Sequence, residues 1–208
     1  MERSAADPAS GRREQQKAAR RERIHAAARA LFVDRGYDAT SLDDIAAAAG
    51  VARGTFFNYF PSKAAVLAEQ YQRLAQEFVA LLDAAEQGTA RDRLILLFRG
   101  AEALLRREGD FASVVYHQAF REPEVVAADA GTEARVFERW VQWFEEAKQR
   151  GEIRPGADSA LLATVIMDVW FATLRAWIAA DRRFGLADLA AEKLGLLFDG
   201  VRGGGGQV

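Results

Sequence analysis

Apolar residues recur at helical spacing along almost the whole chain, and this pattern predicts an all-α protein of about nine helices. Gly36, Gly50, Gly109 and Gly151 follow apolar stripes and are placed to end helices. Residues 129–132 are expected to form a loop. The expected helices cover residues 17–34, 41–49, 52–59, 62–86, 90–108, 110–120, 132–150, 158–181 and 186–201.

The same pattern divides the chain into three parts. We expect a three-helix head over residues 1–60, a larger helical body over residues 61–202 and a glycine-rich flexible tail over residues 203–208. Residues 1–15 carry Pro, Gly, Ser and charges without an apolar period, so a disordered arm is expected there.

Two short helices in the head are separated by a tight turn. Thr40 and Ser41 are candidate N-caps, and Asp44 lies three residues after Ser41 as the return partner of a capping box. Gly50 sits where a helix must end with positive φ, and Val51 restarts the apolar pattern. These signals predict a helix-turn-helix.

The second of these helices, residues 52–59, has an outward face suited to nucleic acid. Phe56 and Phe60 are four residues apart and are expected to face the core. The remaining side chains supply guanidinium, hydroxyl, amide and aromatic groups, which bind base edges and phosphates. Ser62 is expected to cap the next helix, with Lys63 beside its N-terminus as a phosphate-binding cation.

The segment GTFFNYFPSK, residues 54–63, resembles the DNA-binding signature of the TetR family of bacterial transcriptional regulators. In that family a Gly-Thr-Phe-Tyr-Asn-Tyr-Phe-like helix precedes a Ser-Lys pair. This chain departs from the pattern at Ala52, where a capping Ser is frequent, at Phe57, where Tyr is common, and at Ala65, where Glu is frequent. The resemblance places the following residues at the DNA: Thr40, Ser41, Arg53, Gly54, Thr55, Phe57, Asn58, Tyr59 and Lys63.

The resemblance implies a homodimeric, ligand-responsive repressor of a palindromic operator in double-stranded DNA. Two reading helices related by a dyad address half-sites one helical turn, about 34 Å, apart. A transcriptional activator with the same fold and an all-α interaction or scaffold protein are alternatives. Several cations near the N-terminus either contact DNA phosphates or are solvated surface charge: Arg12, Arg13, Lys17, Arg20 and Arg21.

Residues 158–181 are apolar nearly all round, so that helix needs cover on two sides. A second copy of the subunit is the simplest second cover, and the last expected helix can join it in a four-helix bundle across a two-fold axis. The candidate dimer contacts are Leu162, Ile166, Trp170, Trp177, Leu194 and Phe198.

The resemblance also implies a small-molecule pocket in the body, and the apolar, aromatic character of the candidate lining suggests a hydrophobic or aromatic effector that releases the protein from DNA. Aromatic residues at helical spacing belong to an ordinary core more often than to a pocket. The candidate lining residues are Phe78, Phe98, Tyr116, His117, Trp140, Phe144 and Trp170.

Composition and charge argue against an enzyme, a metalloprotein and a membrane-spanning protein. The net charge is −2, but residues 1–63 carry 11 Lys and Arg against 8 Asp and Glu, so the acidic excess lies in the body. The chain has no Cys and two His, and it shows no catalytic constellation, so we expect no enzyme, no metal site and no cofactor. Neither a membrane span nor a secretion signal is expected, which favours a cytoplasmic protein.

Overall fold

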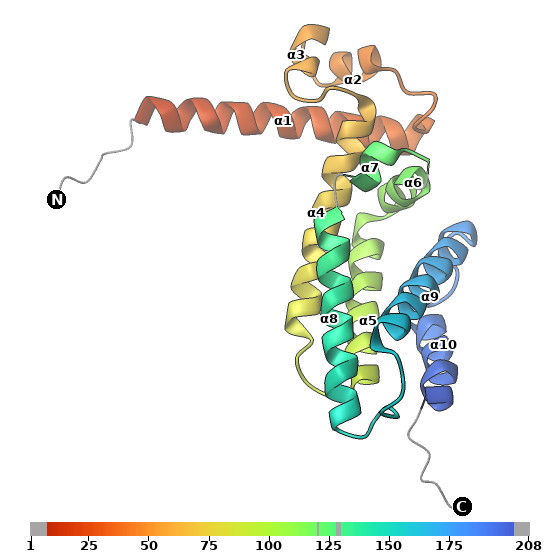
Figure 1. Ribbon diagram of the computed structural model, residues 1–208. Helices are drawn as coiled ribbons and strands as arrows, with labels where there is room; N and C mark the ends of the chain where they lie inside the picture. The colour runs from red at the N-terminus through yellow and green to blue at the C-terminus, as the bar shows by residue number, and fades with distance from the viewer. Residues whose placement is uncertain (1–7, 120, 128–129, 202–208) are drawn as a thin grey trace, which may run out of the picture. The chain divides into compact units, whose positions relative to one another are not determined.

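The computed structural model describes residues 8–119, 121–127 and 130–201, and these residues form ten α-helices and no strand (Figure 1). The all-α prediction is confirmed. The helices are α1 (Pro8–Arg35), α2 (Leu42–Ala48), α3 (Arg53–Phe57), α4 (Lys63–Ala84), α5 (Ala90–Glu108), α6 (Asp110–Ala119), α7 (Pro123–Ala127), α8 (Ala130–Gln149), α9 (Ser159–Ala179) and α10 (Leu186–Val201).

Helix α1 begins at Pro8, earlier than the expected start near residue 17. Residues 8–15 are therefore helical, where a disordered arm was expected. The absence of an apolar period shows only that this segment has no packing partner, whereas its Ala, Arg, Glu and Gln residues favour helix. Residues 1–7 of the expected arm and the expected tail at 203–208 lie outside the described residues.

The other differences lie between α6 and α8. Helix α7 has only five residues, too few to show an apolar period, and the sequence did not predict it. Helix α8 begins at Ala130, so Gly131 and Thr132 lie in its first turn, where a loop and a cap were expected. A helical Gly costs about 1 kcal/mol relative to Ala. Burial of Trp140 and Trp143 further along α8 offsets that cost.

The chain forms two compact units. The first contains residues up to 71 together with 110–128, and the second contains residues 72–109 together with those from 129 onward. Helix α4 contributes to both units. Helix α6 belongs to the first unit because it packs on α1. The functional division at residue 60 that the sequence suggests stays a prediction.

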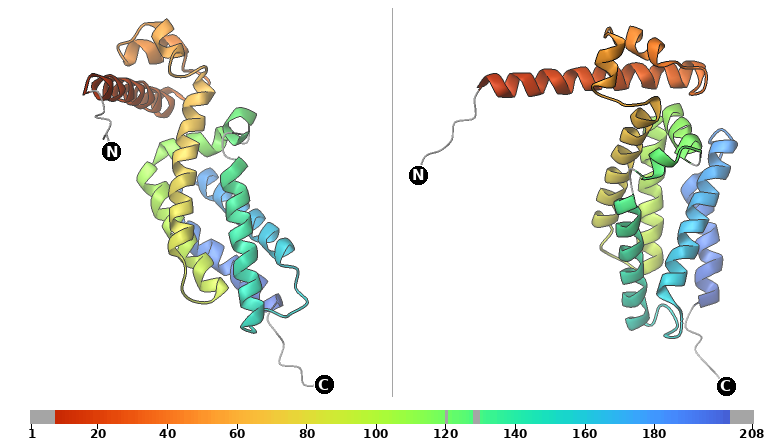
Figure 2. Two further views of the ribbon diagram at one scale, coloured as in Figure 1. Left: turned by 60° about the vertical axis from the view of Figure 1, so that its left-hand side comes forward. Right: turned by 45° about the horizontal axis from the view of Figure 1, so that its top comes forward.

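In the first unit, α2 packs on α1 and α3 packs on α2 (Figure 2). Ile24, Phe32, Ile45, Phe56 and Phe60 are at most 1% exposed and form its core. The ring of Phe111 on α6 also packs edge-on against the buried His25 of α1, with centroids 6.0 Å apart. The core therefore fixes both short helices to the long one.

In the second unit, α10 packs on α5 and α9, and α9 also packs on α8. Thr89 and Asp92 form the capping box of α5, and Asp158 caps α9 by accepting hydrogen bonds from the N–H groups of Ala160 and Leu161. By length and composition alone α9 could cross a membrane, and 39% of its most apolar stretch is buried. One face of this apolar helix is thus covered inside the chain and the other is not.

Candidate nucleic-acid interface

Helix α2 is held by the capping box that the sequence predicts. The Ser41 hydroxyl accepts a hydrogen bond from the Asp44 N–H at 3.1 Å, and the Asp44 carboxylate accepts one from the Ser41 N–H at 3.0 Å. The hydrogen bonds from the Ser41 hydroxyl and N–H lower the pKa of Asp44 below its usual value. The carboxylate therefore stays ionised at neutral pH and keeps the start of α2 ordered.

The turn into α3 follows the predicted chemistry as well. Gly50 has φ +64°, and the Val51 N–H donates to the Ala46 carbonyl at 3.0 Å. Ala52 is the N-cap of α3 and provides no side-chain hydrogen bond. The five residues of α3 therefore depend on packing more than on capping.

The face of α3 opposite the core points to solvent. Arg53, Phe57 and Asn58 are exposed, while Thr55 and Tyr59 are half-buried. A Cβ placed on Gly54 would meet no atom within 4 Å in the described chain, so another molecule can approach this backbone closely. Helix α3 ends at Phe57, before the expected end at residue 59, so the predicted set of outward groups is presented on α3 and the turn that follows it.

Arg53 is held in place by its neighbours. Its Nη1 lies 2.7 Å from Oδ2 of Asp43 on α2, and its guanidinium lies 5.8 Å from the centre of the Phe57 ring. Both side chains of the ion pair are more than 60% exposed, and such a pair contributes at most about 1 kcal/mol. The guanidinium is therefore oriented but free to exchange its partner.

Thr40, predicted at the DNA, is instead buried, with 1% of its surface exposed. Its hydroxyl donates to the Gly36 carbonyl at 2.8 Å and lies 3.3 Å from the Leu31 carbonyl. The N-cap of α2 is Ser41, one residue later, so the Thr40 side chain closes the turn after α1. Only Ser41 of this pair reaches the surface.

Lys63, also predicted at the DNA, closes the same turn from the other side. Its Nζ donates to the carbonyls of Tyr37 at 2.7 Å and Thr40 at 3.1 Å and lies 4.4 Å from the centre of the Tyr37 ring. Ser62 caps α4 as predicted, accepting from the Ala65 N–H at 3.0 Å. Lys63 therefore orders the backbone before α2 through carbonyl oxygens, which compete with any phosphate.

Arg21 has a role in the head that sequence reasoning missed. From α1 it donates to the Tyr59 carbonyl at 2.9 Å, pairs with Glu69 on α4 at 2.6 Å and stacks 4.4 Å from the centre of the Phe60 ring. These partners are 38 to 48 residues away, so no local spacing could have revealed them. Arg21 therefore connects the residues that follow α3 to the long helices α1 and α4.

Polar contacts also join the turn after α1 and the residue before α4 to α7 and the residues that precede it. Arg121 pairs with Asp38 at 3.6 Å, and the Ser62 hydroxyl lies 3.2 Å from a Glu124 oxygen. Burial of Tyr37 and the nearby Glu122 carboxylate raise the pKa of the Tyr37 phenol above its ordinary value. The phenol is therefore neutral at physiological pH and serves as a hydrogen-bond donor.

The predicted ligand residues do not form one group. Trp170 lies at the centre of an aromatic cluster in the second unit, 4.5 Å from Phe98 and 6.1 Å from Phe78 between ring centroids, and Trp140 lies 6.2 Å from Phe98. Phe144 packs instead near Phe198.

Two members of the predicted set belong to the first unit. The Tyr116 ring packs near that of Tyr71 at 5.7 Å, and His117 is exposed. The structure therefore brings together four of the seven predicted lining residues.

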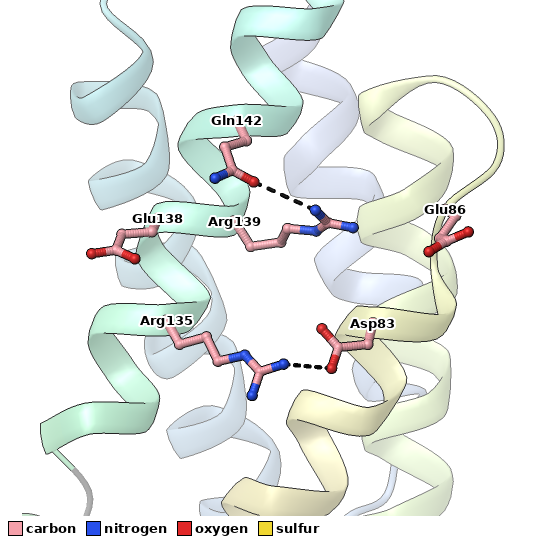
Figure 3. Close-up of a pocket in the computed structure, with 6 residues that line it drawn as sticks. All are labelled: Asp83, Glu86, Arg135, Glu138, Arg139 and Gln142. Atoms are coloured by element: carbon pink, nitrogen blue, oxygen red, sulfur yellow. Dashed lines mark hydrogen bonds and ion pairs between the residues drawn. The ribbon is translucent and has the colours of Figure 1, made fainter.

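The second unit also contains a charged cleft of roughly 370 Å³ between the end of α4 and α8 (Figure 3). Arg135 pairs with Asp83 across it at 2.7 Å, and Arg139 lies 3.4 Å from the Gln142 amide oxygen. Glu86 and Glu138 complete the lining, which makes three carboxylates against two guanidinium groups. This lining does not match the apolar pocket expected from the sequence.

Comparison with known proteins identifies the family. A model described as bacterial regulatory proteins, tetR family, matches residues 24–69. The HTH-type transcriptional repressor KstR of Mycolicibacterium smegmatis is 31% identical over 173 residues, which span 82% of this chain and 81% of KstR. The chain belongs to the TetR family.

Two solved TetR-like structures share the fold over most of their length. FadR from Bacillus subtilis, in complex with stearoyl-CoA, has a TM-score of 0.71 at 25% identity over 87% of this chain and 99% of its own. FadR from Thermus thermophilus, a TetR-family repressor in complex with lauroyl-CoA, has a TM-score of 0.63 at 28% identity over 90% and 99%. This TetR-family chain therefore has the body as well as the head of such regulators.

The dimer contacts predicted for this TetR-family chain are instead buried within the single subunit. All six side chains are at most 9% exposed, because they pack against the chain's own helices. The opposite faces of α9 and α10 carry Leu161 and Leu196, which are 61% and 78% exposed. The six buried residues are Leu162, Ile166, Trp170, Trp177, Leu194 and Phe198.

The corrected role of Thr40 can be tested by Thr40→Val, which keeps the shape and removes the hydroxyl. We expect a loss of about 1–2 kcal/mol in the free energy of unfolding, measured in urea, because buried carbonyls lose their donor. Thr55→Val is the matched control, since no hydrogen bond from the half-buried Thr55 hydroxyl is present in the described chain, and it should change stability by less than about 0.5 kcal/mol. If Thr40→Val left the free energy of unfolding unchanged but weakened DNA binding, Thr40 would be a DNA contact as first predicted.

Proposed function

We propose that the protein is a homodimeric, ligand-responsive repressor that binds a palindromic operator through α3. The observation that carries this proposal is that Arg53 on α3 and its C-cap Asn58 are exposed, while Phe56 and Phe60 are buried and anchor the same segment. A packing unit needs no such outward groups. An operator-binding protein of this kind acts in the bacterial cytoplasm.

The proposed contacts divide by chemistry. The Arg53 guanidinium suits guanine, and the Asn58 amide suits adenine in the major groove. Ser41 at the N-terminus of α2 and Tyr59 at the end of α3 suit phosphate oxygens. The remaining contacts of α3 are Gly54, through close backbone approach, and Thr55 and Phe57, through the thymine methyl or the sugar-phosphate edge.

Selection from a random duplex pool tests DNA reading. The wild-type protein should enrich a palindrome, and Arg53→Ala and Asn58→Ala should each weaken binding to it by about 1–3 kcal/mol and relax the base preference at one position. Arg99→Ala, at an exposed position on α5, is the charge-matched control for Arg53→Ala and should bind as wild type. Retention that is weak, independent of sequence and equal in all variants would favour the scaffold function instead.

The proposed dimer uses the uncovered faces of α9 and α10. Leu161, Val165, Asp168 and Ala172 follow one another at helical spacing on the outer face of α9, and Leu196 is exposed on α10. An apolar helix with one face buried in its own subunit gains most by burying the other against a second copy.

Leu161→Glu combined with Leu196→Glu should turn the dimer into a monomer, because four carboxylates would be buried across the two-fold axis. Sedimentation velocity measures the change. Leu96→Glu, at a 58% exposed position on α5, is the matched control and should stay dimeric. A double variant that still sediments as a dimer would place the interface elsewhere.

We further propose that the effector has a long apolar acyl chain. The two FadR relatives were solved with acyl-CoA molecules, and the aromatic cluster around Trp170 offers apolar surface in the second unit. Such an effector would weaken DNA binding by preferring a body conformation that holds the two heads at the wrong spacing. Typical coupling of this kind is about 1–3 kcal/mol, or ~5 to 150-fold in affinity.

Titration of the protein–operator complex with lauroyl-CoA and stearoyl-CoA tests the effector class. Fluorescence anisotropy of the labelled duplex should fall in the presence of either acyl-CoA and stay constant with coenzyme A alone. Trp170→Leu should weaken this response without changing DNA affinity in the absence of effector. If all three ligands leave the complex intact, acyl-CoA is not the effector.

A further inference from the structure

The N-terminal part of α1, up to Arg20, is a basic helical segment whose residues from Gly11 onward are all exposed. Every residue from Gly11 to Arg23 is exposed, and Ile24 is the first buried position of the helix. In Figures 1 and 2 this part of α1 extends beyond α2 and α3. Residues 11–20, which precede the contacts of Arg21, are ten residues and span about 15 Å at 1.5 Å each.

The charge of this segment is strongly one-sided. Residues 11–23 contain six Lys and Arg against two Glu. Among the described residues, Arg13, Lys17 and Arg20 have no carboxylate within ion-pair distance. Arg13 and Lys17 are four apart, so they repel each other along the helix.

The three cations also share a face. Arg13, Lys17 and Arg20 follow the i, i+4, i+7 spacing, and Arg21 lies at the edge of the same stripe. Arg21 contacts the Tyr59 carbonyl and the Phe60 ring at the end of the reading segment. The stripe therefore starts beside the reading helix and runs away from it along α1.

We propose that this stripe is a second DNA-contact surface, which binds the phosphate backbone flanking each half-site. The inference rests on the proposed function, because it assumes that α3 meets duplex DNA. Arg13 to Arg20 spans about 10 Å along the helix axis, which equals roughly three phosphate steps of one strand. Such contacts carry no base preference and add affinity that depends on salt.

The test is the triple variant Arg13→Gln, Lys17→Gln, Arg20→Gln. Gln has nearly the helix propensity of Lys and Arg, so the segment stays helical, which far-UV circular dichroism checks. Binding is measured by anisotropy between about 50 and 200 mM KCl. The probes are the selected palindrome and a mixed-sequence duplex of equal length that extends beyond both half-sites.

A plot of log K against log salt should be less steep for the variant, by up to about 2.7 units per subunit. The affinity lost between about 50 and 200 mM KCl should then be about 40-fold smaller than for wild type. The preference for the palindrome over the mixed duplex should stay as in wild type. The control Arg99→Gln, Arg154→Gln, Arg183→Gln removes the same charge from exposed positions of the second unit and should keep the wild-type slope.

A triple variant whose slope matches this control on both duplexes would overturn the proposal. That outcome is separate from failure of the proposed function, in which no palindrome is selected and Arg53→Ala changes nothing. If the proposed function fails in this way, binding to the mixed duplex still tests the stripe, because contacts with phosphates do not depend on base sequence.

Discussion

Burial of Phe56 and Phe60 is the interaction on which the reading surface depends. Helix α3 has five residues and an N-cap without a side-chain hydrogen bond, so it has too few internal hydrogen bonds to stand alone. Both rings are fully buried with centroids 6.0 Å apart, and each such burial is worth about 1.5–3 kcal/mol. The positions of Arg53 and Asn58 on the other face follow from that anchoring.

The head could be predicted well where its signals are local. Ser41 and Asp44 meet within one turn, and Gly50 supplies a backbone conformation that few other residues adopt, so sequence spacing alone is enough for both. The roles of Thr40 and Lys63 could not be predicted in this way. Both have hydroxyl or ammonium donors that suit a phosphate, but backbone carbonyls of the folded turn, up to 26 residues away for Lys63, take those donors first.

The body shows a different limit of periodicity. An apolar stripe tells how many faces of α9 need cover, but it does not tell which face meets the same chain. The subunit core takes the largest side chains, Trp170 and Trp177, because they fill the most space per residue. The outer face carries Leu161, Val165 and Ala172 together with the charged Asp168 and Arg175. The aromatic cluster around Trp170 is core for the same reason, and an effector would have to enter by displacing those contacts.

The start of α4 is tied by hydrogen bonds to the turn before α2. The second half of α4 belongs to the second unit, and the first residue of the helix, Lys63, is bonded to the carbonyls of Tyr37 and Thr40. A shift of the first turn of α4 would therefore move the turn before α2 through these hydrogen bonds. The buried Phe56 and Phe60 would carry α3 with the same core. Lys63 thus anchors the backbone before α2 through its carbonyl oxygens, and a phosphate contact by the same side chain stays a prediction.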